Sequence, residues 1–164
     1  MQVAILSDLH DNYTAWQIIL KQIQQQKIET ILYCGDLAAP SMLKKMIEEY
    51  EGQVHLVFGN VADRETETKI AGTSDKVTHY GDQAELEIDG KKIALNHFPD
   101  KGKELAESGQ YDYVFHGHNH QQAQAEIGNT TLINPGTAGG MFQYPSYAVV
   151  DFSNDTVEFK NITL

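Results

Sequence analysis

Short apolar runs alternate with helical patterns over the first half of the chain, and this order restricts the fold more than any other feature. Residues 3–7 form an apolar run rich in branched side chains, and residues 16–23 place apolar side chains three or four positions apart, as on one face of a helix. Residues 30–33 and 53–58 form two further strand-like runs, and Pro40 opens a second helical pattern between them. Strands that alternate with helices predict a largely parallel sheet whose loops gather at the carboxyl ends of the strands.

The second half of the chain carries hairpin signals instead. Residues 85–88 and 91–95 are strand-like and flank Asp89-Gly90, a pair that favours a two-residue turn. Residues 153–155 link two more strand-like runs in the same manner. We therefore expect antiparallel strands in this half, and an α/β fold with a mixed sheet or two stacked sheets.

The length and composition favour one globular domain. At 164 residues the chain can bury a core without staples, and we expect a single domain over residues 1–164. No stretch approaches the roughly 18 consecutive apolar residues of a membrane helix, so we expect no membrane association. The first charged residue, Asp8, comes too early for a signal-peptide core, which points to the cytoplasm. The one cysteine, Cys34, excludes an intramolecular disulfide and is expected to be buried.

The net charge is strongly acidic. A formal charge of -11 and a pI near 4.9 argue against strong binding of duplex nucleic acid, which depends on Lys and Arg side chains that neutralise phosphates. Bound divalent cations would reverse the local field, so a metal site can still attract an anionic substrate. The net charge therefore excludes one class of partner and leaves the substrate open.

Polar residues that can bind metals close five of the predicted strands. Seven such residues follow apolar runs: Asp8 and His10 after residues 3–7, Asp36 after 30–33, Asn60 after 53–58, His97 after 92–96, and His118 and His120 after 112–115. Residues two apart at a strand end can project from one side, which would aim Asp8 and His10 at one point. Glycine precedes both Asp36 and Asn60, so the backbone can turn sharply there. Turn preferences do not call for histidine, and we interpret the set as metal ligands.

The types of ligand indicate the metal. Imidazole and carboxylate oxygen without thiolate suit Mn, Fe, Zn, Co or Ni rather than a structural zinc site or an all-oxygen calcium site. Seven candidate ligands are more than one ion can bind. They suit two ions about 3.5 to 4 Å apart, with a carboxylate such as Asp36 as a bridge. We therefore expect two divalent metal ions per chain as cofactors, with Mn as the first choice and Ni, Fe, Zn, Co or Mg as alternatives.

The motifs at these strand ends resemble those of a known family, the calcineurin-like metallophosphoesterases. The matching motifs, in the family's order, are Asp8-x-His10, Gly35-Asp36, Gly59-Asn60, His97 and Gly117-His118-x-His120. Residues 7–12, 134–137 and 145–148 are further similar to the small single-domain phosphodiesterase branch that is related to the retromer scaffold subunit. The resemblance covers nearly the whole chain. It implies a four-layer sandwich, with two mixed β-sheets flanked by helices.

The resemblance also implies roles for these residues. The first metal ion would be held by Asp8, His10, Asp36 and His120, and the second by Asp36, Asn60, His97 and His118. Hydroxide bound to the metals would attack phosphorus in line, while Asp36, Asn60 and His97 place the metals and the phosphate. Asn60 would also contact the substrate. The implied function is a phosphodiesterase that acts on a small phosphodiester without a protein nucleophile.

Two positions near the motifs bear on catalysis. Many family members have histidine directly after the asparagine, where this chain has Val61. Either Asp63 or a metal-bound water would then protonate the leaving oxygen, or the activity favours leaving groups that need little protonation. Asn12 fits two interpretations, a contact to the substrate or the cap of the helix that follows it.

Four other sites have a structural alternative. Residues 134–136 fit either a turn or a loop whose amides bind phosphate. His116 fits either a packed histidine or a side chain that supports the ligands. His55 and His79 match no motif, and we expect both to be structural.

Three alternatives to a phosphodiesterase stay open. The first is a protein-binding scaffold of the same fold, which would have no need of the complete ligand set. The second is a phosphomonoesterase, which includes a nucleotide phosphatase or a phosphoprotein phosphatase. The third is a nuclease or nucleotide phosphodiesterase, and the 12 Lys and Arg residues are too few for a long basic groove that binds nucleic acid. We also expect a homo-oligomer, for which segment 139–144 and the helices are candidate apolar contacts and no interface is assigned.

Overall fold

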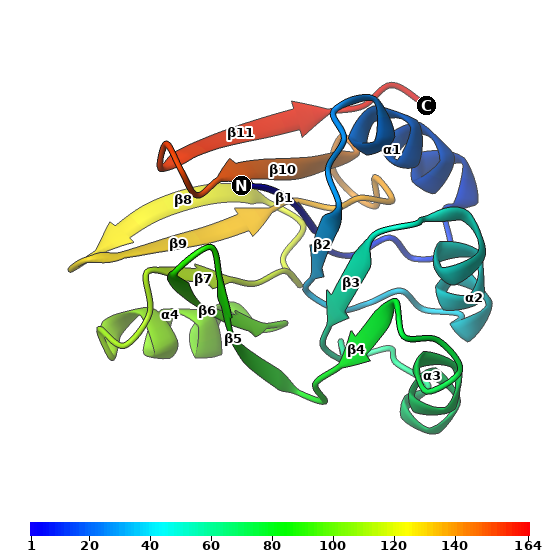
Figure 1. Cartoon of the computed structure of the whole chain (residues 1–164), viewed down its shortest axis with the longest axis horizontal. Helices are drawn as coiled ribbons and strands as arrows, with labels where there is room; N and C mark the ends of the chain where they lie inside the picture. The colour runs from blue at the N-terminus through cyan, green and yellow to red at the C-terminus, as the bar shows by residue number, and fades with distance from the viewer.

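Two β-sheets lie face to face in the computed structural model, which describes residues 1–164 (Figure 1). The first sheet contains β1 (Gln2–Leu6), β2 (Thr30–Tyr33), β3 (Gln53–Leu56), β4 (Val77–His79), β10 (Ser146–Asp151) and β11 (Thr156–Asn161), in the order β11-β10-β1-β2-β3-β4. Strands β1 to β4 are parallel, and β10 and β11 are antiparallel to their neighbours. The alternation of strands and helices in the first half therefore gives the predicted parallel core.

The second sheet is formed by the later part of the chain. It contains β5 (Gln83–Ile88), β6 (Lys91–Asn96), β7 (Tyr113–Phe115), β8 (Gln122–Ile127) and β9 (Thr130–Pro135), in the order β5-β6-β7-β9-β8. Strands β6, β7 and β9 are parallel, and β5 and β8 are antiparallel edges. Asp89 and Gly90, at φ values of 53° and 75°, form the predicted turn between β5 and β6.

Helices cover the outer faces of both sheets. The chain has four helices, α1 (Tyr13–Gln25), α2 (Pro40–Glu49), α3 (Arg64–Ala71) and α4 (Pro99–Glu107). Side chains of α1, α2 and α3 pack on the first sheet, and those of α4 pack on the second (Figure 1). No helix is both long enough and apolar enough to cross a membrane. The result is the predicted four-layer sandwich, an α/β fold with two mixed sheets between helices.

Successive side chains of a strand point to opposite faces of the sheet, and this alternation divides the hydrophobic core into layers. In β1, Ala4 and Leu6 belong to the cluster beneath α1 and α2, whereas Val3 and Ile5 pack between the two sheets. Both faces of this central strand are buried, so its sequence is continuously apolar rather than alternating. Cys34 lies in the cluster between the sheets, as predicted.

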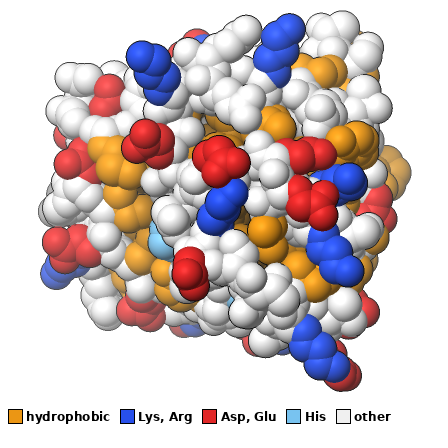
Figure 2. Space-filling view, turned by 45° about the vertical axis from the view of Figure 1, so that its right-hand side comes forward, with side chains coloured by type: hydrophobic (Ala, Val, Ile, Leu, Met, Phe, Trp, Pro, Cys, Tyr) orange, Lys and Arg blue, Asp and Glu red, His pale blue; other side chains and the backbone are white.

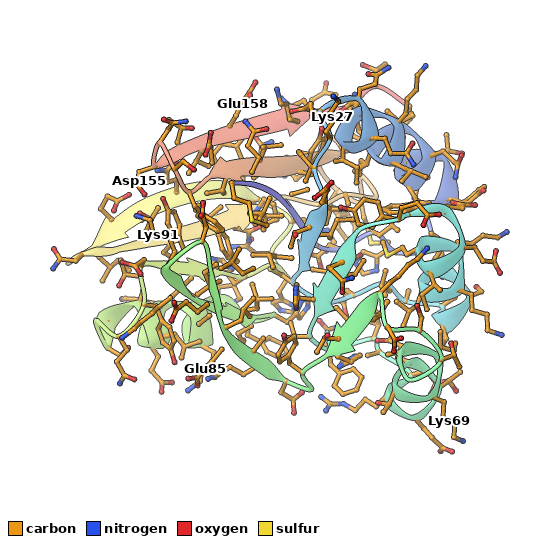
Figure 3. All side chains as sticks on the ribbon, in the orientation of Figure 1. Lys27, Lys69, Glu85, Lys91, Asp155 and Glu158 are labelled. Carbon is orange, nitrogen blue, oxygen red and sulfur yellow. The ribbon has the colours of Figure 1, made fainter.

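Charged side chains occupy the periphery. Acidic and basic groups are interspersed over one face of the molecule, with no continuous patch of Lys and Arg (Figure 2). Lys91 and Asp155, both labelled in Figure 3, join the β5–β6 turn region to the β10–β11 turn, with 2.7 Å between Nζ and Oδ1. The amino group of Met1 is 2.7 Å from Asp89 Oδ2 at the same end of the sheets. Both ion pairs lie at the amino end of β1, and they do not obstruct the carboxyl end of this strand.

Candidate metal centre

Loops at the carboxyl ends of β1, β2, β3, β6 and β7 meet between the two sheets. The backbone locks them together: the N–H of Asp8 donates to the carbonyl of Gly35 (3.0 Å), and that of Gly117 donates to the carbonyl of His97 (3.0 Å). The N–H of Gly139 donates to the carbonyl of Asp8 (3.0 Å). All seven residues predicted as ligands lie in these loops. The connections explain how residues far apart in sequence reach one centre.

The backbone at the centre differs from the prediction in one respect. Asp8 and His10 were expected to project from one side of an extended strand end, but both lie in the left-handed region. Five of the seven residues have positive φ: Asp8 (55°), His10 (45°), Asp36 (60°), His118 (74°) and His120 (61°). This conformation is uncommon for residues other than glycine, and strained backbone of this kind concentrates at functional sites. The side chains converge because of these turns, not because of strand alternation.

One group of side chains surrounds Asp8. Its Oδ1 atom lies 3.3 Å from His120 Nε2 and 3.7 Å from His10 Nε2. This oxygen is fully buried and has no hydrogen-bond partner. His120 Nδ1 is 2.9 Å from the carbonyl oxygen of Met141, which can only accept, so the ring proton is on Nδ1 and the lone pair of Nε2 faces Asp8. This tautomer is the one that a metal ligand requires.

A second group forms around Asp36. Its Oδ2 atom lies 3.2 Å from His97 Nε2, and Asn60 Oδ1 lies 3.0 Å from the same nitrogen. Asn60 Oδ1 is also 2.9 Å from His118 Nδ1. His97 Nδ1 donates to the carbonyl of Cys34 at 2.7 Å, which directs Nε2 toward the carboxylate. Asp36 and His97 are buried, whereas Asn60 and His118 are exposed and accessible to a substrate.

The two groups are linked through their carboxylates. Asp36 Oδ2 is 4.0 Å from His10 Nε2 of the first group, which places Asp36 between the two as the bridging role requires. Asp8 also belongs to both of the closest sets, Asp8–His10–His120 and Asp8–Asp36–His97, whose ligand atoms all lie within 4.8 Å of one another. His118 stands outside these sets and joins them through Asn60.

The carboxylates make this centre attractive to positive charge. Burial alone would raise the pKa of Asp36, but hydrogen bonds with His97 and with the N–H of Val61 outweigh it and bring the pKa below its ordinary value. The pKa of His10 is raised, chiefly by Asp8. Burial works to lower the pKa of His97, yet the neighbouring Asp36 and Asp8 raise it overall. A field that holds protons on these rings also favours metal cations, which compete for the same nitrogens.

Two glycines allow the backbone to come close to the carboxylates. A Cβ atom on Gly59 would overlap Asp36 Oδ1 and the backbone nitrogen of Asp36. A Cβ atom on Gly117 would overlap Ser7 Oγ and come within 2.6 Å of Asp8 Oδ2. Glycine is therefore required at these positions for steric reasons, as the sequence indicated for Gly59.

The residues present fit divalent metal ions. A fully buried carboxylate oxygen without a hydrogen-bond partner costs free energy unless a cation meets it, and Asp8 Oδ1 is such an atom. Imidazole Nε2 atoms with their other nitrogens fixed by carbonyls face the two carboxylates. The donor set combines carboxylate, amide and imidazole, which suits transition-metal ions.

Asn12 and Asp63, the two remaining catalytic or substrate-binding candidates, have structural roles. Asn12 Oδ1 accepts from the N–H of Ala15 (3.0 Å) as the N-cap of α1, and its Nδ2 donates to Gly139 O (2.7 Å), so both polar groups are engaged. Asp63 is the N-cap of α3, where the N–H of Thr66 lowers its pKa. A carboxylate held ionised is a poor proton donor, which argues against Asp63 as the general acid.

The histidines outside the motifs are packed. His116 is buried, burial lowers its pKa, and Gly102 of α4 lies against its ring. His55 Nδ1 meets Tyr80 Oη at 2.9 Å, and the buried side chain of His79 faces Glu67. These contacts favour the structural interpretation for all three. Asn134 and Pro135 end strand β9, and Asn134 Oδ1 accepts a hydrogen bond from the N–H of Gly136 directly after it.

Sequence reasoning missed two kinds of contributor. The carbonyls of Cys34 and Met141 orient ligand imidazoles, but every residue has a carbonyl, so no sequence signal could have found them. Two phenylalanine rings also border the ligands. Phe98 lies 5.0 Å from His118 and Phe142 lies 5.8 Å from His120, between ring centroids. An aromatic residue directly after His97 was the one available signal.

Two mixed sheets between helices, with carboxylate, amide and imidazole groups at the carboxyl ends of the strands, define a metal-dependent phosphoric ester hydrolase. Residues 1–155 match the Calcineurin-like phosphoesterase superfamily domain, and the chain belongs to this superfamily.

Known proteins similar to the chain agree with this membership. The chain is 26% identical to Phosphodiesterase MJ0936 of Methanocaldococcus jannaschii over 168 residues, which cover 100% of this chain and 99% of that protein. The solved structure of a novel archaeal phosphodiesterase superimposes with a TM-score of 0.91 at 23% identity, over 99% of this chain and 100% of the other. Wild-type Vps29 of Entamoeba histolytica complexed with Zn²⁺ superimposes with a TM-score of 0.68 at 19% identity, over 99% and 98% of the two chains. The structural likenesses show the fold.

Proposed function

We propose that residues 1–164 form one domain that hydrolyses a small phosphodiester with two divalent metal ions. The observation that carries the proposal is the convergence of donors on Asp8: its buried, unpartnered Oδ1 faces the Nε2 atoms of His10 and His120, and Asp36 and His97 form a second set with it. One ion would be held by Asp8, His10, Asp36 and His120, and the other by Asp36, Asn60, His97 and His118. The phosphodiesterase named among the relatives supports a diester as the substrate.

The metal ions would supply charge neutralisation at the phosphoryl oxygens and a lower pKa for the attacking water. Mn²⁺ is our first choice because the donors are imidazoles, carboxylates and one amide. The Zn²⁺ complex of Vps29 supports a transition-metal site in this fold. The cytoplasm stays a prediction.

The protein's own side chains would position the reactants. The Cys34 carbonyl holds the His97 ring so that Nε2 stays directed at Asp36, and the Met141 carbonyl does the same for His120. Asn60 and His118 are exposed, and their polar groups would contact the phosphoryl oxygens. Hydrolysis adds water across one phosphorus–oxygen bond: the water oxygen bonds to phosphorus, and the leaving oxygen departs with the electron pair and gains a proton.

A diester fits the centre better than a monoester. No hydrogen bond or ion pair joins a Lys or Arg side chain to any of the seven residues. A phosphomonoester carries about two negative charges near neutral pH, whereas a diester carries one. Without cationic side chains, the second charge of a monoester would meet Asp8 and Asp36 with less compensation. This contrast supports the phosphodiesterase over the phosphatase.

The leaving group should matter. Val61 occupies the position after Asn60 and cannot donate a proton, and Asp63 is a helix cap with a lowered pKa. Aryl esters, whose oxygens leave with little protonation, should therefore react faster than alkyl esters.

Protein binding is the second candidate. The exposed rings of Phe142 and Tyr144 and the likeness to Vps29 favour it. The same segment would serve a homo-oligomer, which stays a prediction.

Hydrolysis of bis(p-nitrophenyl) phosphate tests the first proposal. Metal-stripped protein should gain activity when Mn²⁺ is added, and Asp36→Asn should lower kcat/KM by about 10³-fold, since several kcal/mol of charge stabilisation is lost at about 1.4 kcal/mol per tenfold. Asp63→Asn is the matched control, because asparagine also caps helices and its activity should be retained. Folded protein without activity on Mn, Ni, Co, Zn or Fe would contradict the proposal and favour the scaffold.

A further inference from the structure

A cavity of about 340 Å³ opens beside His120, next to the proposed metal centre. Its lining includes His120, Tyr144 and four residues with amide side chains, Gln121, Gln122, Gln143 and Asn161. None of the lining residues is Lys, Arg, Asp or Glu. The cavity therefore suits a neutral group that hydrogen-bonds, and an additional phosphate or carboxylate would find no cationic side chain there.

The amides of the cavity are available for recognition. Gln122 Nε2 donates to Asn161 Oδ1 at 2.9 Å, which holds the two side chains together. The pair keeps an acceptor, Gln122 Oε1, and a donor, Asn161 Nδ2, that form no hydrogen bond within the protein. A free acceptor and a free donor are the groups that can hydrogen-bond to the polar edges of a nucleobase.

Two aromatic rings beside the cavity have free faces. Phe142 is 87% exposed and Tyr144 is 85% exposed, the two highest values among the large hydrophobic residues. The Phe142 ring lies nearly parallel to the ring of His120, at 26° between their planes. Phe142 also has a φ of 65°, an unfavourable conformation for a bulky side chain. Neither burial nor backbone preference explains a phenylalanine there, whereas a stacking role would.

We infer that this cavity binds the nucleoside part of a nucleotide phosphodiester, with the phosphate at the metal centre. The inference rests on the proposed function and names its substrate class. A nucleobase offers a planar face to Tyr144 or Phe142 and polar edges to the amides, and every base can stack on an aromatic ring because each has a π-face. The volume lies near the lower limit of about 300–1,000 Å³ for small-molecule sites, which suits one nucleoside. A glycerol or short alkyl group would leave the aromatic faces unused.

Three esters with one shared leaving group separate recognition from chemistry. Thymidine 5′-(p-nitrophenyl phosphate), phenyl p-nitrophenyl phosphate and methyl p-nitrophenyl phosphate all release p-nitrophenolate, so only the retained group differs. With Mn²⁺-loaded protein, kcat/KM should be highest for the thymidine ester, by about tenfold or more over the methyl ester. Equal values for the three esters would overturn the nucleoside site and leave the phosphodiesterase standing. Equal values for the thymidine and phenyl esters would reduce the site to one for any aryl group and also overturn it.

Variants assign the preference to the cavity. Tyr144→Ala should lower the ratio of kcat/KM for the thymidine ester to that for the methyl ester by about tenfold, and Tyr144→Phe should retain it. Gln143→Ala should lower the ratio by a smaller factor. The matched control is Gln110→Ala, an exposed glutamine between α4 and β7, which should leave the ratio unchanged. An unchanged ratio in Tyr144→Ala would contradict the inference.

Binding provides a measurement that does not depend on turnover. Thymidine 5′-monophosphate, titrated into ¹⁵N-labelled protein, should shift the backbone amide signals of Gln121, Gln143 and Tyr144. If no ester is hydrolysed, the proposed function fails, and these shifts still decide the nucleoside site. Thymidine 5′-monophosphate without any shift in these signals would overturn the inference whatever the activity.

Discussion

The protein contains two buried clusters of carboxylate and imidazole, and only one of them has enough donors to fit a metal centre. In the second cluster, Glu67 Oε2 of α3 lies 3.6 Å from Nε2 of His79 in β4. Glu67 Oε1 and His79 Nε2 have no hydrogen-bond partner, just as Asp8 Oδ1 has none. Burial and an unpartnered oxygen are therefore shared by both clusters. They do not distinguish a metal site from a structural pair.

The number and direction of the donors make the difference. Asp8 faces His10 and His120, and Asp36 and His97 follow within the same 4.8 Å sets, whereas Glu67 has one imidazole. His79 Nδ1 accepts from the N–H of Gly81 at 3.0 Å, so its proton is on Nε2 and faces the carboxylate. The N–H there faces Glu67 Oε2 at 3.6 Å, which is beyond hydrogen-bond distance. The two tautomers are therefore opposite. His120 directs a lone pair at Asp8, as a metal ligand does, whereas His79 directs a proton at Glu67, as a structural side chain does.

Metal binding should distinguish the two clusters most clearly. At a Mn²⁺ concentration about 100 times Kd, the free energy of unfolding of metal-stripped protein should rise by about 2.7 kcal/mol, since the folded state alone has the site. His120→Ala should lose most of this gain. Urea denaturation with and without Mn²⁺ measures it.

His79→Ala is the matched control for this experiment. It removes the imidazole of the structural cluster, so it should lower stability in the absence of metal and keep the full gain on adding Mn²⁺. An equal loss of the Mn²⁺ gain in both variants would show that the two clusters are not distinct.

The sequence predicted the strands whose residues are buried, but it did not predict those whose residues are exposed. Strand β2 has four buried residues, and its apolar run predicted its bounds. Strand β8 has the sequence QAQAEI with five exposed residues, so it has no apolar face for the sequence to reveal. Helix α3 was missed for the same reason, because it buries only Glu67, Ile70 and Ala71 among polar neighbours. Pairing of β8 with β9, and packing of α3 against α2 and β4, determine these elements.

The centre was predictable in composition but not in geometry. The seven side chains could be chosen because each closes an apolar strand and because turns do not call for histidine. The left-handed backbone of five of these residues and the positions of the Cys34 and Met141 carbonyls depend on loops that meet only in the folded chain. The N-caps at Asn12 and Asp63 are the opposite case. An N-cap depends only on neighbouring residues of the chain, and this local role accounts for both side chains.

Substitution at Gly59 should sharpen the comparison by moving a ligand without removing it. A Cβ atom there meets Asp36, so Gly59→Ala should weaken Mn²⁺ binding by about 10- to 100-fold, as for a misplaced ligand. Gly72→Ala, at the C-cap of α3, is the control. Its Cβ would lie 3.6 Å from the nearest atoms, an ordinary contact, so affinity should not change. Isothermal titration with Mn²⁺ compares them, and equal affinities would show that Asp36 is not a ligand.

Glu67→Gln should separate stability from activity. The substitution keeps the shape of the side chain and removes its charge, so the contact with His79 weakens and the free energy of unfolding should fall by about 1 kcal/mol. The rate of diester hydrolysis should not change, because Glu67 is not in the metal centre. Urea denaturation and the p-nitrophenolate assay measure the two quantities. A loss of activity at full stability would place Glu67 in the catalytic centre and remove the contrast.

The smallest effect is expected at His55, a half-buried histidine with no carboxylate partner. Burial lowers the pKa of His55 in the folded protein, and its ring meets Tyr80 Oη at 2.9 Å. The unfolded chain, with an ordinary pKa of about 6.5, then binds the proton more readily. The contribution of His55 to stability is therefore complete above about pH 6.5 and is lost as the pH falls toward the lowered value. His55→Gln should remove this dependence, so the difference in unfolding free energy between wild type and variant should shrink between about pH 7.5 and 5.5. A difference that stays constant or grows on acidification would show that the ring is protonated in the folded state, as a histidine with a carboxylate partner would be.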